Sequence, residues 1–284
     1  MRVVPLYDSY VLVTSCRCTR GLDIYNLSPS VPSPFICTLE LPNSDDQKHI
    51  SWYRISTGER TTRSEGHFRA DPSPSVTVVA LTGTYSHNNS EHVSMSHLLI
   101  PHATLSAQIQ AAESRLRTAP KQSPQATSPR QATTRPPNSA PVRVPWRDWG
   151  PRGCLWLRVP LDILVSTPDA MPAIVIPSGS RLPLLVYHSP DAAGFVYVFD
   201  VNPLAARHAR QPPAARQRSN SEPETTGALV EDIEAVLPGV VDPECSGIPY
   251  VAYRFELPEW RDGRQIRSVE MCMTGFAIEV SPLL

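Results

Sequence analysis

Prolines occupy 31 of the 284 positions, and this density limits the folds open to the chain more than any other feature. It is roughly twice the usual share of about 5%. Proline lacks an amide donor and clashes with the preceding helical turn, so a helical bundle cannot hold this many. Loops, strand ends and sheet edges can hold them. We therefore expect strands and loops to dominate the fold.

Short apolar or alternating segments, bounded by Gly, Pro, Asn, Asp or Ser, indicate many short strands. They lie at 10–14, 22–25, 35–41, 50–55, 76–81, 92–100, 155–159, 173–176, 184–187, 195–199, 250–257, 266–273 and 275–280. Three alternating segments, 37–42, 155–160 and 253–258, each stop at a proline, as equivalent strands of successive blades would. The pattern favours an all-β protein: a propeller-like, incomplete array of antiparallel strands with about three to four blades.

Two or three short helices are expected at the edges of this array. Leu105, Ile109, Ala112 and Leu116 share one helical face and predict a helix over 104–117. Pro203 favours one or two helical turns at 204–210. A short acidic helix is predicted from the face formed by Leu229, Ile233, Val236 and Leu237.

Residues 118–144 contain Ser, Thr, Gln, Ala and Pro with several basic and no acidic residues, a composition typical of disorder. A second polar insertion spans 211–226. We expect an N-terminal propeller-like β region at 1–117 that ends in a helix, a disordered basic linker at 118–144, and a C-terminal propeller-like β region at 145–284 that carries the second insertion.

The overall charge points to neither nucleic acid nor membrane as a partner. The net charge is -1 and the pI about 6.7, so the chain has no general attraction for polyanions. No apolar run approaches the roughly 18 residues of a membrane span, and the first residues do not form a signal peptide. Six scattered cysteines favour free thiols over disulfides. We expect an intracellular protein, cytoplasmic or nuclear.

Residues 145–160 hold three of the five tryptophans, directly behind the predicted linker. Trp146, Trp149 and Trp156, with Arg152, are the candidate partner-binding residues, because tryptophan and arginine are enriched in interface hot spots. The alternative is that the large rings pack in the core where the chain re-enters the β structure.

A family resemblance rests on two motifs: Trp149-Gly150-Pro151-Arg152-Gly153 and, downstream, Tyr197-Val198-Phe199-Asp200-Val201-Asn202-Pro203-Leu204-Ala205. This pairing resembles the region behind the F-box in basidiomycete fungal F-box-type proteins. Segments 34–42, 96–101 and 231–238 are also similar to that region and follow the same order. The resemblance implies a WD-like β-propeller region that presents a substrate or partner to a ubiquitin ligase, with the F-box itself absent ahead of residue 1.

No side-chain pattern commits the chain to a reaction. His87, His92, His97 and His102 recur every five residues, and an odd spacing turns successive members of a strand to opposite faces, so no metal site is expected. Cys154 or Ser178 would be the nucleophile of an enzyme, but neither stands in a nucleophile-elbow pattern. The sequence predicts a non-catalytic interaction module without cofactor; the alternative is a hydrolase-like enzyme with its site at the mouth of the β-blades.

The two polar insertions carry candidate phosphorylation sites. Ser123 and Ser128 each precede a proline, as proline-directed kinases require. Arg218-Ser219-Asn220-Ser221-Glu222-Pro223 matches a 14-3-3-type recognition pattern centred on phosphorylated Ser221. The expected partners are therefore a substrate or partner protein and, at Ser221, a phospho-dependent adaptor.

Overall fold

The structure is a computed structural model of the 284-residue chain. It describes residues 2–6, 9–14, 21–30, 34–41, 47–57, 75–87, 90–118, 142–160, 173–187, 194–211, 227–257, 264–272 and 275–282.

The chain divides into two compact units, and each unit combines two separate stretches of sequence. Met1–Pro42 and Thr104–Trp149 form unit 1, and Asn43–Ala103 and Gly150–Leu284 form unit 2. The regions predicted from the sequence, 1–117 and 145–284, are each one continuous stretch of the chain. The predicted linker at 118–144 and the insertion at 211–226 lie almost wholly outside the described residues.

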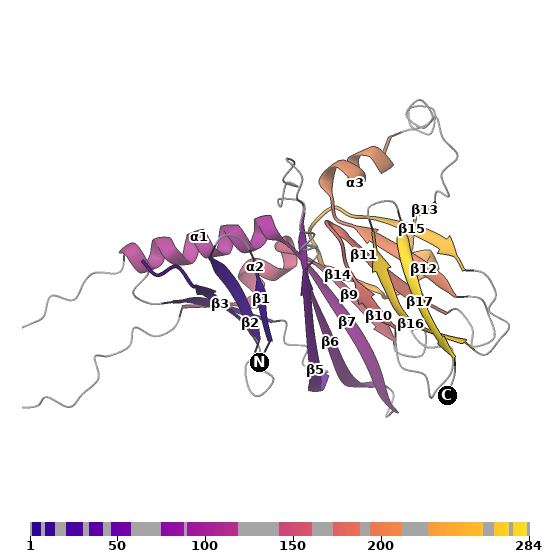
Figure 1. The fold of residues 1–284 in the computed structure, drawn as a ribbon, viewed down its shortest axis with the longest axis horizontal. Coiled ribbons are helices and arrows are strands. Elements are labelled where there is room, and N and C mark those ends of the chain that lie inside the picture. Colours follow the sequence, from indigo (N-terminus) through magenta and orange to yellow (C-terminus); the bar gives the residue numbers. More distant parts are fainter. Residues whose placement is uncertain are drawn as a thin grey trace, which may run out of the picture. The chain divides into compact units, whose positions relative to one another are not determined.

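Unit 1 is a five-stranded sheet, here called sheet A, with one long helix (Figure 1). Its strands are β1 (Arg2–Pro5), β2 (Tyr10–Thr14), β3 (Gly21–Asn26), β4 (Phe35–Glu40) and β8 (Arg143–Val144), in that spatial order. Neighbours from β1 to β4 run antiparallel, whereas β8 runs parallel to β4. The helix α1 spans His102–Thr118.

The core of unit 1 lies between sheet A and α1. The register puts Leu12 opposite Ile24 and Ile24 opposite Cys37, and all three are fully buried. From α1, Leu105, Ile109 and Ala112 are buried at the predicted helical spacing, which confirms the predicted helix. Leu116 is 41% exposed, so the apolar stripe ends one turn before the end of the helix.

Unit 2 contains three further sheets. Sheet B has the order β14 (Val241–Ser246), β9 (Leu155–Pro160), β7 (Ser90–Pro101), β6 (Val76–His87) and β5 (Gln47–Thr57). Sheet D has the order β11 (Arg181–Val186), β12 (Phe195–Asp200), β15 (Val251–Glu256) and β13 (Ala228–Val230). Sheet C has the order β10 (Ile174–Ile176), β16 (Arg264–Met271) and β17 (Phe276–Pro282).

The three sheets of unit 2 stack in layers, with sheet D in the middle (Figure 1). One core joins sheets B and D through residues such as Leu99, Leu157 and Leu184. A second core joins the other face of sheet D to sheet C through Val196 and Val269. Because β11 and β12 are buried on both faces, their sequences are nearly continuous apolar runs and do not alternate.

The prediction of a mainly antiparallel β protein is confirmed, with two exceptions: β4 pairs in parallel with β8, and β10 with β16. None of the four described sheets closes on itself. The propeller-like arrangement stays a prediction.

The helices differ from the expected two or three short ones. The described residues form four: α1 with 17 residues, α2 (Trp146–Gly153), α3 (Pro203–Ala209) and α5 (Ile233–Val236). The turn predicted at 204–210 is confirmed as α3. Leu229 was predicted on a helix face but lies in β13, because hydrogen bonding to β15 overrides the helical spacing of the apolar residues. Among the described helices, none has the length and apolar character to cross a membrane.

Candidate functional site

Trp149 and Trp146 lie on the first two turns of α2. Trp149 is buried, and its indole Nε1 donates a 3.0 Å hydrogen bond to the backbone carbonyl of Glu40 at the end of β4. The Trp146 ring is half-buried and meets the Trp149 ring edge-on, with centroids 5.0 Å apart. Trp149 therefore connects α2 to sheet A by a hydrogen bond, in agreement with the alternative that the large rings pack in the core. The Trp146 ring packs against the Trp149 ring.

Trp156 is buried in β9 and has a different environment. The guanidinium carbon of Arg158 lies 4.1 Å from the centroid of the Trp156 ring, a cation–π geometry. Arg158 also forms an ion pair with Asp242 on the neighbouring strand β14, with 2.6 Å between Nη2 and Oδ2. This group holds the surface of sheet B together.

Among the four predicted partner-binding residues, Arg152 alone is classed as exposed. Next to it, the backbone carbonyl of Pro151 accepts a 3.1 Å hydrogen bond from the amide of Gly247. The structure thus leaves exposed surface on Arg152 and part of Trp146, whereas the rings of Trp149 and Trp156 are enclosed. The four residues do not form a single exposed platform.

The two candidate nucleophiles make structural contacts. The Cys154 thiol is buried and donates to the backbone carbonyl of Gly150 at 2.9 Å, one turn earlier in the chain. Ser178 lies in a tight turn in which its backbone amide and that of Arg181 donate to each other's carbonyls. Both are local hydrogen bonds to backbone carbonyl groups, which stabilise the turns in which Cys154 and Ser178 lie.

His97 is the most unusual polar side chain that the structure describes. It is 1% exposed, and neither ring nitrogen has a hydrogen-bond partner within the described part of the chain. Its cross-strand neighbours on β6 and β9 are Ala80 and Leu157, so the ring faces the core between sheets B and D. Burial lowers the pKa of His97 to about 4 and keeps the ring neutral.

Of the four histidines that recur every five residues, the structure describes the side chains of His97 and His102. His102 begins α1, and its Nε2 lies 3.4 Å from Thr77 Oγ1. Within the residues that the structure covers, no three His, Cys, Asp or Glu side chains gather as metal ligands would.

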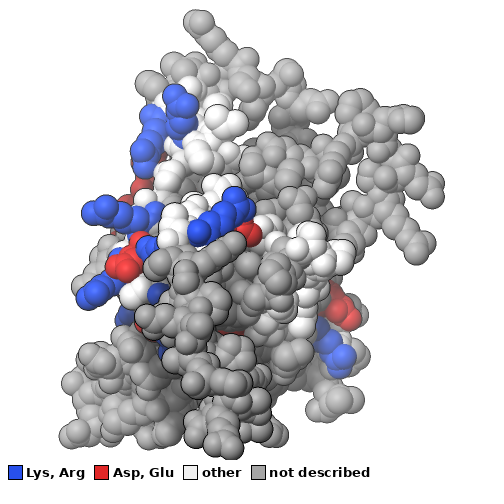
Figure 2. Space-filling model, turned by 90° about the vertical axis from the view of Figure 1, so that its left-hand side faces the viewer, with Lys and Arg blue, Asp and Glu red and all other residues white. Residues whose placement is uncertain are grey.

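Some of the charged side chains on the described surface form short-range ion pairs. Figure 2 shows more basic than acidic side chains on one face of the molecule, with red and blue groups in contact. In unit 1, exposed ion pairs join Arg117 to Glu113, Arg143 to Glu40 and Arg147 to Asp148. The candidate phosphorylation sites Ser123, Ser128 and Ser221 lie outside the described residues.

The described residues of unit 2 form an open groove. It has a volume of about 830 Å³ and lies between α3, β13 and the segment that leads into β15. Its lining consists of Ala206, Ala209, Arg210, Leu229, Val230, Glu231, Ile233, Gly247, Ile248, Pro249, Tyr250, Val251 and Ala252.

The wall formed by α3 is positioned by the segment Asp200-Val201-Asn202-Pro203. Asp200 Oδ1 accepts hydrogen bonds from Ser180 Oγ at 2.6 Å and from the Asn202 amide at 2.8 Å. Asn202 in turn caps α3, because its Oδ1 accepts from the Leu204 amide at 2.9 Å. Pro203 occupies the start of the helix, where its missing amide costs nothing. The motif that carries the family resemblance thus fixes one wall of the groove.

The groove is lined by apolar side chains and by a comparable area of polar atoms. Ala206 and Ala209 present small side chains, which leaves room for a ligand against α3. Tyr250 packs against Phe199 with ring centroids 6.2 Å apart. Burial raises the pKa of Tyr250, and the nearby carboxylates of Glu234 and Asp232 raise it further. Arg210 and Glu231 add exposed charges of opposite sign.

Sequence reasoning did not find this groove. Its parts come from three segments that are distant in the sequence, and the pairing of β13 with β15 brings them together. Two local signals were available. One was the Asn-Pro helix start at 202–203, and the other was the segment Gly247-Ile248-Pro249-Tyr250, which puts partly exposed apolar and aromatic residues before a strand.

No family model matches the chain, and comparison with curated proteins and with solved structures gives no significant match to either.

Proposed function

We propose that the chain is a non-catalytic protein-interaction module, and that the groove between α3, β13 and 247–252 holds an extended segment of its partner. The observation that carries this proposal is the groove itself, which is open, has a volume of about 830 Å³ and is lined by apolar side chains together with polar and charged groups. Peptide-recognition sites share this combination, because apolar contacts supply affinity and a few polar groups set orientation.

The chemistry of the groove favours binding over catalysis. The ionisable groups along its lining are Arg210, Glu231 and Tyr250, and neither candidate nucleophile, Cys154 or Ser178, lines it. A hydrolase-like enzyme would need a nucleophile beside a base in such a cavity. The interaction reading therefore ranks above the hydrolase-like alternative.

The finer proposal is the substrate-recognition region of an F-box-type ubiquitin-ligase adaptor, in an intracellular protein. Two features support it. The Asp200–Pro203 segment of the resembling motif builds a wall of the groove. The face-to-face stacking of sheets B, D and C is also how neighbouring propeller blades pack, although the order β11-β12-β15-β13 differs from a simple four-strand meander. The proposal includes a phospho-dependent adaptor at Ser221 and excludes nucleic acid and membrane as partners.

Affinity purification of the whole chain with identification of the bound proteins tests the proposal. We compare the native chain with Ala209→Arg, which fills the groove from α3, and with Ala205→Arg, which adds the same side chain to α3 outside the groove lining. We expect ubiquitin-ligase subunits and a shared set of substrates with the native chain and Ala205→Arg. Ala209→Arg should lose the substrates.

Equal recovery with Ala209→Arg and the native chain would remove the groove from the proposal. Recovery without ligase subunits in all three samples would contradict the F-box-type function while leaving the interaction function in place. Thermal unfolding of the three proteins checks that both arginine variants fold.

A further inference from the structure

We propose that the outer edge of β17 binds an extended, basic segment of a partner protein by strand addition, which would extend sheet C by one strand. This site lies on a different sheet from the groove and does not depend on it. Strand addition needs a run of unpaired backbone donors and acceptors at a sheet edge, and side chains then set the preference for one partner.

The other described sheet edges carry features that discourage pairing with another chain. Three edge strands, β8, β10 and β13, are only two or three residues long. Three more contain a proline, which removes a donor: Pro5 in β1, Pro183 in β11 and Pro243 in β14. The long edge strand β5 is interrupted by two register shifts.

The edge of β17 also ends in a proline, as the four-residue β1 does, but six residues that carry amide donors precede that proline in the chain. It runs for seven residues, Phe276–Pro282, with proline only at its last position. Within the described residues it pairs with β16 on one side only. The one register shift in this pair leaves the additional residue, Arg267, on β16, so β17 itself stays regular.

Side chains on β17 alternate between the two faces of sheet C. Phe276 and Ile278 are partly buried and pack against the core between sheets D and C, and Phe276 meets Phe255 edge-on at 5.1 Å. A further strand beside β17 would cover the exposed parts of these side chains. The incoming segment therefore needs apolar residues at every second position.

The opposite face of β17 gives the site its charge preference. Glu279 is exposed there, and its Oε2 accepts a 2.9 Å hydrogen bond from Ser268 Oγ on β16. A basic residue directly across from Glu279 would pair with it, whereas an acidic residue would be repelled. Antiparallel pairing of two β17 strands about this position would place two Glu279 side chains opposite each other, which disfavours a second copy of the chain as the occupant.

The test uses the whole chain and two synthetic, fluorescein-labelled peptides. The basic peptide is Thr-Val-Lys-Val-Thr-Ile-Thr, and the acidic peptide has glutamate in place of lysine. By fluorescence anisotropy, we expect the native chain to prefer the basic peptide by about three- to tenfold in Kd. Glu279→Lys should reverse the preference, and a peptide with proline at its central valine should not bind.

Asp148→Lys is the control variant, because it makes the same change of charge on the exposed surface of α2 in unit 1. It should keep the native preference. Failure of the native chain to bind the basic peptide, or equal binding of both peptides by the native chain and Glu279→Lys, would overturn the proposal. A native chain that dimerises in sedimentation and excludes the peptide would assign the edge to a second copy and overturn it too.

Discussion

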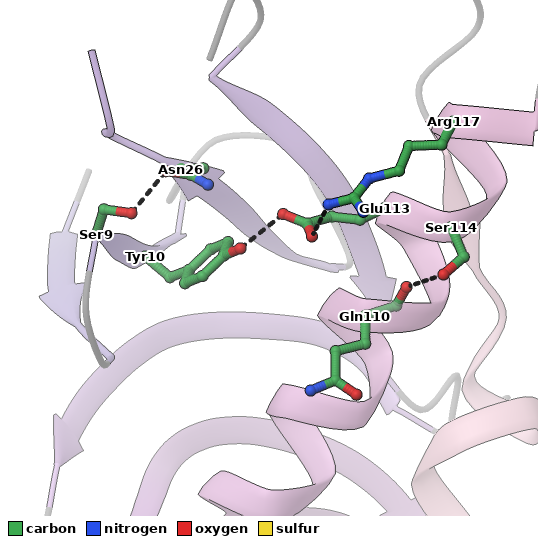
Figure 3. Close-up of polar contacts among 7 residues, drawn as sticks. All are labelled: Ser9, Tyr10, Asn26, Gln110, Glu113, Ser114 and Arg117. Atoms are coloured by element: carbon green, nitrogen blue, oxygen red, sulfur yellow. Dashed lines mark hydrogen bonds and ion pairs between the residues drawn. The ribbon is translucent and has the colours of Figure 1, made fainter. Parts of the chain in front are cut away.

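The hydroxyl of Tyr10 donates a 2.6 Å hydrogen bond to Glu113 Oε1, and this bond joins β2 to α1 across 103 positions of sequence (Figure 3). The other carboxylate oxygen of Glu113 lies 3.5 Å from Arg117 Nη2, one turn further along α1. Since unit 1 is assembled from two distant stretches of chain, this bond links its two halves directly.

Tyr10→Phe removes this bond while it keeps the ring. We expect a loss of about 1.5–3 kcal/mol from the stability of unit 1, the range for hydrogen bonds to charged groups. Hydrogen exchange of the α1 amides, with and without urea, measures the effect. Tyr25→Phe is the matched control, because Tyr25 contributes an edge-on ring contact with Phe35 in the same sheet. Equal protection of α1 in both variants would contradict the prediction.

The ion pair between Arg158 and Asp242 should respond unequally to loss of either partner. Asp242 is buried, whereas 43% of the Arg158 side chain is exposed. Arg158→Met removes the ion pair of a buried carboxylate and should cost about 3 kcal/mol or more. Asp242→Asn leaves an arginine that reaches water and should cost about 1 kcal/mol or less. Urea unfolding of both single variants and the double variant measures the asymmetry; a larger cost for Asp242→Asn would contradict it.

His97 should make unit 2 sensitive to acid. Its pKa is about 4 in the folded chain because burial disfavours the charged ring, and about 6.5 in an unfolded chain. Between these values the unfolded chain binds the proton and the folded chain does not. Stability that is present above pH 6.5 is therefore lost as the pH falls towards 4, by about 3 kcal/mol in total.

His97→Leu should remove this loss and raise stability at neutral pH, because an apolar side chain leaves no unpaired ring nitrogen in the core. Urea unfolding at a series of pH values from 7 to 4 measures both effects. Replacing the exposed His208 on α3 by leucine serves as the control. An acid-induced loss that is the same in His97→Leu as in the native chain would refute the assignment.

Phosphorylation of Ser221 should create a binding site for a 14-3-3-type adaptor. The phosphate adds negative charge and acceptor oxygens between an arginine and a proline at the expected spacing. Isothermal titration of the adaptor with peptides of residues 215–226, phosphorylated and unphosphorylated at Ser221, provides the measurement. Binding of the phosphorylated peptide that is no tighter than that of the other would eliminate this proposal.

Local sequence patterns predicted several elements well, whether one face or both faces of the element are buried. The strands at 10–14, 155–159 and 195–199 match β2, β9 and β12 because apolar residues and flanking turn residues mark a strand without reference to its neighbours. The buried stripe of α1 was predictable for the same reason.

Pairing between distant strands could not be predicted from such patterns. β7 pairs with β9, with Leu99 opposite Leu155, and β12 pairs with β15 across an insertion in the sequence. Alternation says which residues face inward but not which strand lies alongside. For this reason neither the interleaved units nor the groove, which depends on the pairing of β13 with β15, was foreseen.

The helix α2 was missed for another reason. Gly150 and Pro151 both disfavour a helix interior, so local propensity argues against one at 146–153. Tertiary contacts outweigh this propensity: Trp149 bonds to the end of β4, and the Pro151 carbonyl accepts the amide of Gly247. The tryptophan segment therefore has a structural role through these two contacts. Arg152 and part of Trp146 remain exposed to solvent.

Gly247→Ala tests the contact behind this segment. A Cβ at Gly247 would overlap the Pro151 carbonyl oxygen and would lie 2.6 Å from Arg152 Cα, and both are backbone atoms that cannot rotate away. The alanine should therefore separate the two segments and break their hydrogen bond, at a cost of about 1–3 kcal/mol. Gly275→Ala is the control, because a Cβ there meets no atom within 4 Å, and its effect should stay within about 0.5 kcal/mol. Thermal and urea unfolding measure both variants. Equal stability of the two would show that the close approach of Gly247 to Pro151 does not constrain the fold.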